Sequence, residues 1–184
     1  MTTIIAVDPG IVRCGIAVLT DGKVVHAEVC GPKEVRARLE LWPVSKSQKL
    51  HADLHIEEPE FGYVPAHRCA QVMELVWLCG KLEAWFPDAA WTYRKDVLAA
   101  LRVPAGRGSA DAYLRSEMER RFGDLFYRGK LGPRRNRKAH GADCPTCNGS
   151  GYSHQPGRLT HIPAKARADV IDAIALGLAV LEKR

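Results

Sequence analysis

The feature that most constrains the fold is an apolar run close to the C-terminus. Between Val170 and Val180, only Asp172 and Gly177 lack an apolar side chain, so a helix formed by this run would be apolar on nearly every side. Such a helix must be buried, because none of its faces favours contact with water. The rest of the chain therefore has to provide a surface that covers it. A carboxylate within the helix needs a charged partner or a metal ion.

The first half of the chain is rich in strand signals. Residues 3–8 form a short β-branched run stopped by a Pro-Gly pair, and residues 15–20 and 23–29 follow as two strands. The Asp-Gly pair at 21–22 tolerates the positive φ angles of a tight hairpin turn between them. Two further strands are expected over residues 54–57 and 90–93.

Helical periodicity separates and follows these strands. We expect helices over residues 33–41, 65–86, 95–102 and 109–122, and a last one from Pro163 to the C-terminus. Ser109 can cap the fourth helix, and Gly123 can end it. The second helix carries residues at spacings of three and four that are interpreted as core: Cys69, Val72, Val76 and Cys79. Together these patterns indicate an α/β fold, a mixed five-stranded sheet flanked by helices.

Length and composition suit one domain with a sizeable core, which we take to span residues 1–184. No stretch approaches the roughly 20 apolar residues needed to cross a bilayer, and the N-terminus lacks a signal-peptide pattern. Four cysteines lie singly in apolar surroundings, without the density of a disulfide scaffold. We therefore expect a soluble cytoplasmic protein that does not contact a membrane.

Residues 124–162 lose apolar periodicity and are interpreted as an insertion before the last helix. The chain has a formal net charge of +6, and no acidic residue lies between Asp124 and Asp143, where basic residues are concentrated. These include the candidate DNA contacts Arg134, Arg135, Arg137 and Lys138. Concentrated positive charge favours binding to phosphates, while a solvated basic loop is the alternative interpretation.

The insertion also contains half of a candidate zinc site. Cys144 and Cys147 are separated by two residues and are followed by glycines, which suits a knuckle that directs both thiolates at one metal ion. His140, His154 and His161 are close enough in sequence to complete a four-coordinate Zn²⁺ site, and His140 with His154 is the candidate pair. Two subunits that each contribute a cysteine pair are a second arrangement. A loop with two free thiols is the alternative without metal.

Acidic residues from three parts of the chain can converge in such a fold. Asp8 ends the first strand and Glu57 or Glu58 ends the fourth, while Asp169 and Asp172 lie one turn apart on the last helix. Each alone suits a solvated or helix-end carboxylate. Together they would repel one another unless divalent cations stabilise the ionised forms. Mg²⁺ prefers such oxygen ligands, Mn²⁺ can substitute, and two such ions can hydrolyse a phosphodiester.

Three motifs, in this order along the chain, resemble those of the RuvC-type Holliday junction resolvases. They are residues 5–10 (Ile-Ala-Val-Asp-Pro-Gly) with 15–17 (Gly-Ile-Ala), residues 55–58 (His-Ile-Glu-Glu), and residues 168–175 (Ala-Asp-Val-Ile-Asp-Ala-Ile-Ala). By this resemblance the catalytic metal ligands are Asp8, Glu57, Asp169 and Asp172. Strand alternation sends Glu57 and Glu58 to opposite faces, so only one of them can face the site.

The resemblance further implies an RNase H-like fold and a homodimer that acts on branched DNA. Such a dimer would place two sites on a four-way junction and nick it symmetrically, leaving 5′-phosphate and 3′-hydroxyl ends. It would work in the cytoplasm of a bacterial cell or of a phage-infected host, and a phage version of the family is one of the forms considered.

The candidate DNA contacts depart from the family pattern. Family members often carry a lysine near the start of the helix that contacts DNA, and this chain offers Arg102, Arg107 and Arg115 nearby instead. An aromatic residue after the second acidic motif opens the junction in the family, and Phe61 or Tyr63 can serve here. An aromatic residue in this place is also commonly a packing residue.

Other functions fit parts of the same sequence. An RNase H-like nuclease that cuts RNA–DNA hybrids or flaps would use the same carboxylates. A non-catalytic DNA-binding protein would use the basic insertion alone. An actin-like or sugar-kinase ATPase is suggested by the Asp-Pro-Gly opening, but the chain is short for two such lobes and has no P-loop pattern.

Overall fold

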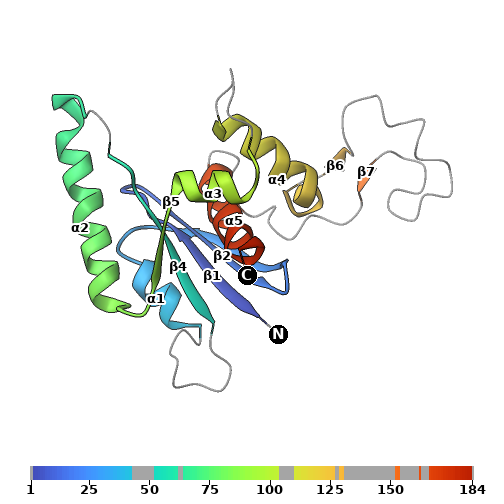
Figure 1. Ribbon diagram of the computed structural model, residues 1–184, viewed down its shortest axis with the longest axis horizontal. Helices are drawn as coiled ribbons and strands as arrows, with labels where there is room; N and C mark the ends of the chain where they lie inside the picture. The colour runs from blue at the N-terminus through green and yellow to red at the C-terminus, as the bar shows by residue number, and fades with distance from the viewer. Residues whose placement is uncertain are drawn as a thin grey trace.

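The computed structural model describes residues 2–42, 52–61, 64–103, 110–126, 129–130, 152–153, 162 and 166–183. Its centre is a five-stranded sheet in the order β3-β2-β1-β4-β5, with helices on both faces (Figure 1). The expected α/β class and mixed sheet are confirmed. Within the described residues, no helix is both long and apolar enough to cross a membrane.

The strands match the sequence patterns closely. They are β1 (Thr3–Asp8), β2 (Cys14–Thr20), β3 (Lys23–Cys30), β4 (Asp53–Glu58) and β5 (Ala90–Tyr93). The first three are antiparallel neighbours, whereas β4 runs parallel to β1 and β5 parallel to β4. Asp21 and Gly22 adopt φ angles of 47° and 78°, as the hairpin turn between β2 and β3 requires.

The helices agree with expectation in number and order within the described residues, but several boundaries differ. They are α1 (Val35–Glu40), α2 (Cys69–Trp85) after the 3₁₀ turn η1 (Ala66–Arg68), α3 (Arg94–Ala100), α4 (Ala110–Phe126) and α5 (Arg167–Glu182). Phe122 has non-helical φ and ψ angles, so the first helical stretch of α4 stops next to Gly123, as expected, and a short second stretch continues to Phe126. The last helix is described from Arg167, and Pro163, where it was expected to begin, lies outside the described residues.

Helix α5 is the centre of the core on one face of the sheet. Its residues from Val170 to Val180 are buried apart from Asp172, and α3 and α4 pack beside it (Figure 1). At Gly177, a Cβ atom would meet the side chains of Leu19 and Ala6, so glycine lets the helix approach the sheet closely. The burial expected for this apolar helix is confirmed.

Helix α2 covers the opposite face with α1, and here the sequence interpretation was wrong. Cys69 and Val76 are exposed, and Val72 and Cys79 are only half-buried. The residues of α2 that pack on the sheet are Leu75, Leu78, Leu82 and Trp85. Apolar residues lie on several sides of this helix, so spacings of three and four residues fit more than one face. Which of these faces is buried depends on how the helix packs against the sheet.

The interpreted insertion lies mostly outside the described residues. Within 124–162 the structure describes the last turn of α4, the short antiparallel pair β6 (Gly129–Lys130) and β7 (Tyr152–Ser153), and Ile162, which is buried in the α5 core. The extent of the domain and of the insertion therefore stay predictions.

Candidate active site

Two carboxylates meet where parallel strands end. Strand β1 pairs with β4 in parallel, with Val7 opposite Ile56, so Asp8 and Glu57 follow at the same carboxyl edge. Ile4 and Ala6 face the α5 core, and strand alternation places Asp8 on that face too. Side chains at the carboxyl ends of parallel strands lie at the border of the sheet. Their oxygens can therefore contact a ligand there.

The structure separates Glu57 from Glu58, a choice that sequence left open. Glu57 lies on the α5 face near Asp8 and bonds to Arg94. Glu58 points to the α2 face, where it lines a hollow with Val76 and accepts a hydrogen bond from the Tyr93 hydroxyl, which raises the pKa of Tyr93. Glu57 is therefore the residue on the same side of the sheet as Asp8.

Helix α5 brings the other two carboxylates to this edge. Asp169 and Asp172 lie on its first two turns, and both act electrostatically on Asp8. The close approach depends on Gly15 in β2, where a Cβ atom would overlap the backbone carbonyl of Asp169. A larger residue at this position would push the start of α5 away from the sheet and carry both carboxylates with it.

Two arginines that sequence reasoning missed hold these carboxylates. The Nη2 group of Arg94 donates to Asp172 Oδ1 at 2.9 Å, and its Nη1 group lies 3.4 Å from Glu57 Oε2. The Nε–H of Arg13 donates to Asp169 Oδ2 at 2.7 Å. Both positions carried a usable signal, because Arg94 directly follows β5 and Arg13 lies in the loop after β1, at the same edge of the sheet.

Asp8 has the most perturbed environment of the cluster. Burial raises its pKa well above the ordinary value, and the negative charges of Glu57, Asp172 and Asp169 raise it further, while Arg94 lowers it. A carboxyl in such surroundings either takes up a proton or requires a cation next to it. The two arginines supply only part of that compensation.

The oxygen donors of this cluster fit a hard divalent cation such as Mg²⁺, which is commonly held by a few carboxylates and water. Among the described residues, however, no three acidic, histidine or cysteine side chains are already arranged around a common metal position. The guanidinium of Arg94 lies between Glu57 and Asp172 instead. The chemistry of the donors fits the metal, and the observed arrangement is that of a cluster bridged by arginine.

The remaining candidate residues lie elsewhere or outside the described residues. Arg102 is exposed at the end of α3, and Phe61 follows β4 with 45% of its surface exposed. Arg115 lies on α4, but its side chain is outside the described residues, as are Tyr63, Arg107, Arg134, Arg135, Arg137, Lys138, His140, Cys144, Cys147, His154 and His161.

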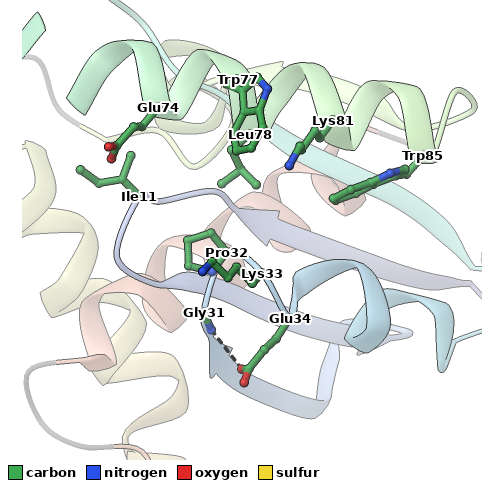
Figure 2. Close-up of a pocket in the computed structure, with 10 residues that line it drawn as sticks. All are labelled: Ile11, Gly31, Pro32, Lys33, Glu34, Glu74, Trp77, Leu78, Lys81 and Trp85. Carbon is green, nitrogen blue, oxygen red and sulfur yellow. Dashed lines mark hydrogen bonds between the residues drawn. The ribbon is translucent and has the colours of Figure 1, made fainter. Parts of the chain in front are cut away.

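A separate groove lies on the other face of the sheet. Figure 2 shows Lys81 and Trp85 of α2 opposite the Gly31–Glu34 segment, with Trp77 beside Lys81. These residues line a hollow of about 730 Å³. The Lys81 ammonium lies 3.3 Å from the centre of the Trp77 ring. This groove contains none of the four carboxylates, so it belongs to a different surface of the molecule.

Comparison with known proteins supports the fold. No family model matches the sequence, and a search of curated proteins finds no relative. Among solved structures, the chain resembles Thermus thermophilus RuvC in complex with a Holliday junction substrate, with a TM-score of 0.51 and 16% identity over 99% of this chain and 94% of that one. It also resembles a second Thermus thermophilus RuvC structure, with a TM-score of 0.53 and 15% identity over 98% and 94% of the two chains. The chain therefore has the RNase H-like fold of RuvC.

Proposed function

We propose that this chain is a Mg²⁺-dependent, structure-selective DNA endonuclease that resolves four-way junctions. The observation that carries the proposal is the convergence of Asp8, Glu57, Asp169 and Asp172, from the beginning, middle and end of the chain, at one edge of the sheet. One of the similar RuvC structures was solved with a Holliday junction substrate, which supports branched DNA as the substrate class. Branched DNA in a bacterial cell or phage-infected host would place the enzyme in the cytoplasm, and a phage origin remains part of the proposal.

The four carboxylates would hold divalent cations, with Mn²⁺ able to replace Mg²⁺. Two such ions would activate a water and stabilise the leaving 3′ oxygen, giving 5′-phosphate and 3′-hydroxyl ends. The protein's own contribution is placement: β1 and β4 fix two carboxylates from the sheet, and α5 fixes two from the helix. Asp8 is partly buried, and a carboxylate shielded from water interacts more strongly with a cation.

Asp8→Asn tests the cluster directly. We expect the variant to lose at least about 10³-fold in cleavage of a synthetic four-way junction in Mg²⁺, because its amide cannot replace an anionic metal ligand. Binding of the junction in EDTA should be retained. Normal cleavage by this variant would contradict the proposal.

The neighbouring glutamates provide a matched pair. Glu57→Gln should abolish cleavage, whereas Glu58→Gln, on the opposite face of the sheet, should leave it within about twofold. Equal losses in both would contradict the placement of Glu57 in the site. Gel assays with 5′-labelled junctions measure both rates and also report the position and symmetry of the nicks.

Parallel substrates separate the related functions. We expect four-way junctions to be cut faster than flaps, RNA–DNA hybrids or linear duplexes of the same sequence. A preference for hybrids or flaps would indicate another RNase H-like nuclease. Binding without any nicking in Mg²⁺ or Mn²⁺ would indicate a non-catalytic DNA-binding protein.

Phosphate contact by Arg102 can be tested without disturbing the fold. Arg102 has a positive φ of 52° at the end of α3, a conformation that glycine adopts more easily. Arg102→Gly should therefore preserve stability while weakening junction binding and reducing its salt dependence by about one phosphate contact. Unchanged affinity would remove Arg102 from the interface. The other basic candidates, from Arg107 and Arg115 to the insertion cluster 134–138, can be tested by the same salt titration.

The aromatic candidates for opening the junction are Phe61 and Tyr63. Phe61→Ala should reduce the cleavage rate more than the binding affinity, because opening the junction is needed only for the reaction. An equal reduction in thermal stability would instead indicate packing.

The exposed face of α2 supports a homodimer. Met73, Val76 and Trp77 are 65%, 44% and 66% exposed, which is unusual for three large apolar residues on one helix. Glu74 and Lys81 lie beside Trp77, two turns apart on α2. If the α2 helices of two copies packed in opposite directions about a twofold axis, Glu74 of each copy would lie near Lys81 of the other. Such an isologous contact would set two active sites on one junction.

Trp77→Glu tests this surface. We expect a dimer in light scattering for the unchanged protein and a monomer for Trp77→Glu, because a carboxylate would be desolvated at the interface centre. Tyr113→Glu is the matched control, since Tyr113 is a 46% exposed aromatic residue on α4. A dimer that survives Trp77→Glu would place the interface elsewhere.

The zinc site remains a proposal based on sequence. The spacing of Cys144 and Cys147, with His140 and His154 nearby, supports one structural Zn²⁺ per chain. Elemental analysis of protein purified without chelator should find about one zinc, and Cys144→Ser should remove it. No zinc in the unchanged protein would leave a glycine-rich loop with free thiols.

A further inference from the structure

We propose that Arg94 is a positioning residue that occupies the metal-binding region of the cation-free protein by bridging Glu57 and Asp172, so that divalent cations must displace it. This inference rests on the proposed function, because it assumes that these carboxylates bind metal. It adds a role for a residue that none of the three acidic motifs contains.

The bridge joins side chains from two different elements. Glu57 comes from β4 and Asp172 from α5, and one guanidinium contacts both. Its side chain is 19% exposed, and those of its two partners are 13% and 18% exposed. The contacts are therefore shielded from solvent and are stronger than exposed ion pairs.

The electrostatics of the cluster explain why a resident cation is needed. Four carboxylates converge here, and they would repel one another without compensation. Arg94 contacts two of them and also acts favourably on the charge of Asp8, and Arg13 compensates Asp169. The start of α5 can therefore pack on the sheet before any metal arrives.

The same contacts oppose metal binding. A cation that takes oxygens from both Glu57 and Asp172 must replace the hydrogen bonds of Arg94 and must bind beside a positive charge, unless the side chain swings away. Arg94 is the first residue of α3, and its long side chain can move without unfolding a helix. Arg94 should therefore lower the affinity of the site for metal ions. An arginine that only holds the site in shape would instead raise this affinity.

Arginine is also the residue type that this bridge requires. Its planar guanidinium directs separate N–H groups at two carboxylates, whereas a lysine ammonium is a compact charge on a flexible stem. Arg94→Lys should therefore keep the charge but bridge less well, and should have an intermediate metal affinity.

Calorimetric titration of the 184-residue chain with Ca²⁺ and with Mg²⁺, in the absence of DNA, tests the inference. Both ions prefer oxygen ligands, which keeps the cysteines of the insertion out of the measurement. The variants are Arg94→Met, Arg94→Lys, Asp8→Asn and, as a control for the change in net charge, Arg36→Met. Arg36 is an exposed residue on α1, which covers the other face of the sheet, and pairs there with Glu40.

We expect Arg94→Met to bind the ions roughly tenfold more tightly than the unchanged protein, because a nearby like charge is removed. Arg36→Met should not change the affinity. Thermal unfolding gives a second readout: Arg94→Met should melt lower in EDTA, and added Ca²⁺ should raise its Tm by more than that of the unchanged protein. Arg94→Lys, the milder variant, carries the test with the same signs if Arg94→Met does not fold.

The possible failures are distinguishable. In one outcome, the unchanged protein binds the ions, Asp8→Asn does not, and the Arg94 variants bind them no more tightly than the unchanged protein. This would overturn the role of Arg94 and leave the nuclease proposal intact. If neither the unchanged protein nor any Arg94 variant bound either ion, both proposals would be overturned. Binding only after removal of Arg94 would support displacement in its strongest form.

Discussion

Helices α5 and α2 are both apolar and cover opposite faces of the same sheet, yet their surroundings differ sharply. Helix α5 is buried from Val170 to Val180 apart from Asp172, because the sheet lies on one side and α3 and α4 pack beside it. Helix α2 buries only Leu78 and Leu82 fully and leaves Trp77 two-thirds exposed. Burial of an apolar helix is therefore favoured by its sequence. Whether the helix is buried within the same chain depends on how many neighbouring elements pack against it.

The difference has functional consequences. Because α5 is held on several sides, it can place Asp169 and Asp172 in a repulsive cluster and remain folded. Because α2 is covered on one side only, its outer face is available for a second copy. The next four predictions test this contrast, from the largest expected effect to the smallest.

Replacing Gly15 should disrupt the packing of α5 on the sheet and have the largest effect of the four changes. In Gly15→Val, the new side chain would overlap the backbone carbonyl of Asp169, which cannot move without shifting α5. We expect a loss of about 3–5 kcal/mol in the free energy of unfolding, measured by urea denaturation, together with loss of junction cleavage. A well-folded variant with normal cleavage would show that α5 does not depend on this contact.

Large apolar residues on the two helices should respond very differently to truncation. Leu176→Ala on α5 should cost about 3 kcal/mol, because a fully buried side chain leaves a cavity. Met73→Ala on α2 should change the stability of the dilute monomer by less than about 0.5 kcal/mol, because Met73 is 65% exposed. Equal costs in denaturant titrations would contradict the difference in burial.

Asp8→Asn should stabilise the metal-free protein while it abolishes cleavage. The pKa of Asp8 is raised in the folded state above its ordinary value of 3.8, so the folded protein holds this proton more tightly than the unfolded chain. Stability must then fall as the pH rises from about 4 through the folded pKa. Asparagine removes this penalty, and we expect a gain of about 1 kcal/mol near pH 7, or roughly 2–4 °C in Tm.

The pH dependence supplies the check on that prediction. In EDTA, the advantage of Asp8→Asn should grow as the pH rises through this window and should vanish below pH 4. A variant that is less stable than the unchanged protein at pH 7 would mean that the Asp8 carboxylate is already well compensated.

Gly80→Ala on α2 should have a small effect, of the opposite sign to that of Gly15→Val. A Cβ atom at Gly80 would meet nothing within 4 Å, and alanine has the higher helix propensity. We expect a gain of about 0.5–1 kcal/mol in the same urea titration. A loss of stability would show that the α2 surface is more tightly covered than its exposure indicates.

Much of this fold was readable from the sequence, because its signals are local. The β-branched runs, the Asp-Gly turn and the apolar segment from Val170 to Val180 depend on neighbouring residues, and each formed the expected element. The four carboxylates could also be singled out, since strand ends and helix turns set their places along the chain. The boundary signal at Gly123 was partly right, because the backbone of α4 leaves helical geometry at Phe122 before a short stretch continues to Phe126.

Tertiary structure decided what depends on contact between distant segments. Which face of α2 is buried, which of Glu57 and Glu58 lies beside Asp8, and where the guanidinium of Arg94 binds were all settled when the sheet and helices docked. The physical reason is that periodicity defines the faces of an element but not their partners. Amino-acid order by itself determined which elements form and which acidic residues stand at their ends, and only the assembled fold joined those residues to the arginines that hold them.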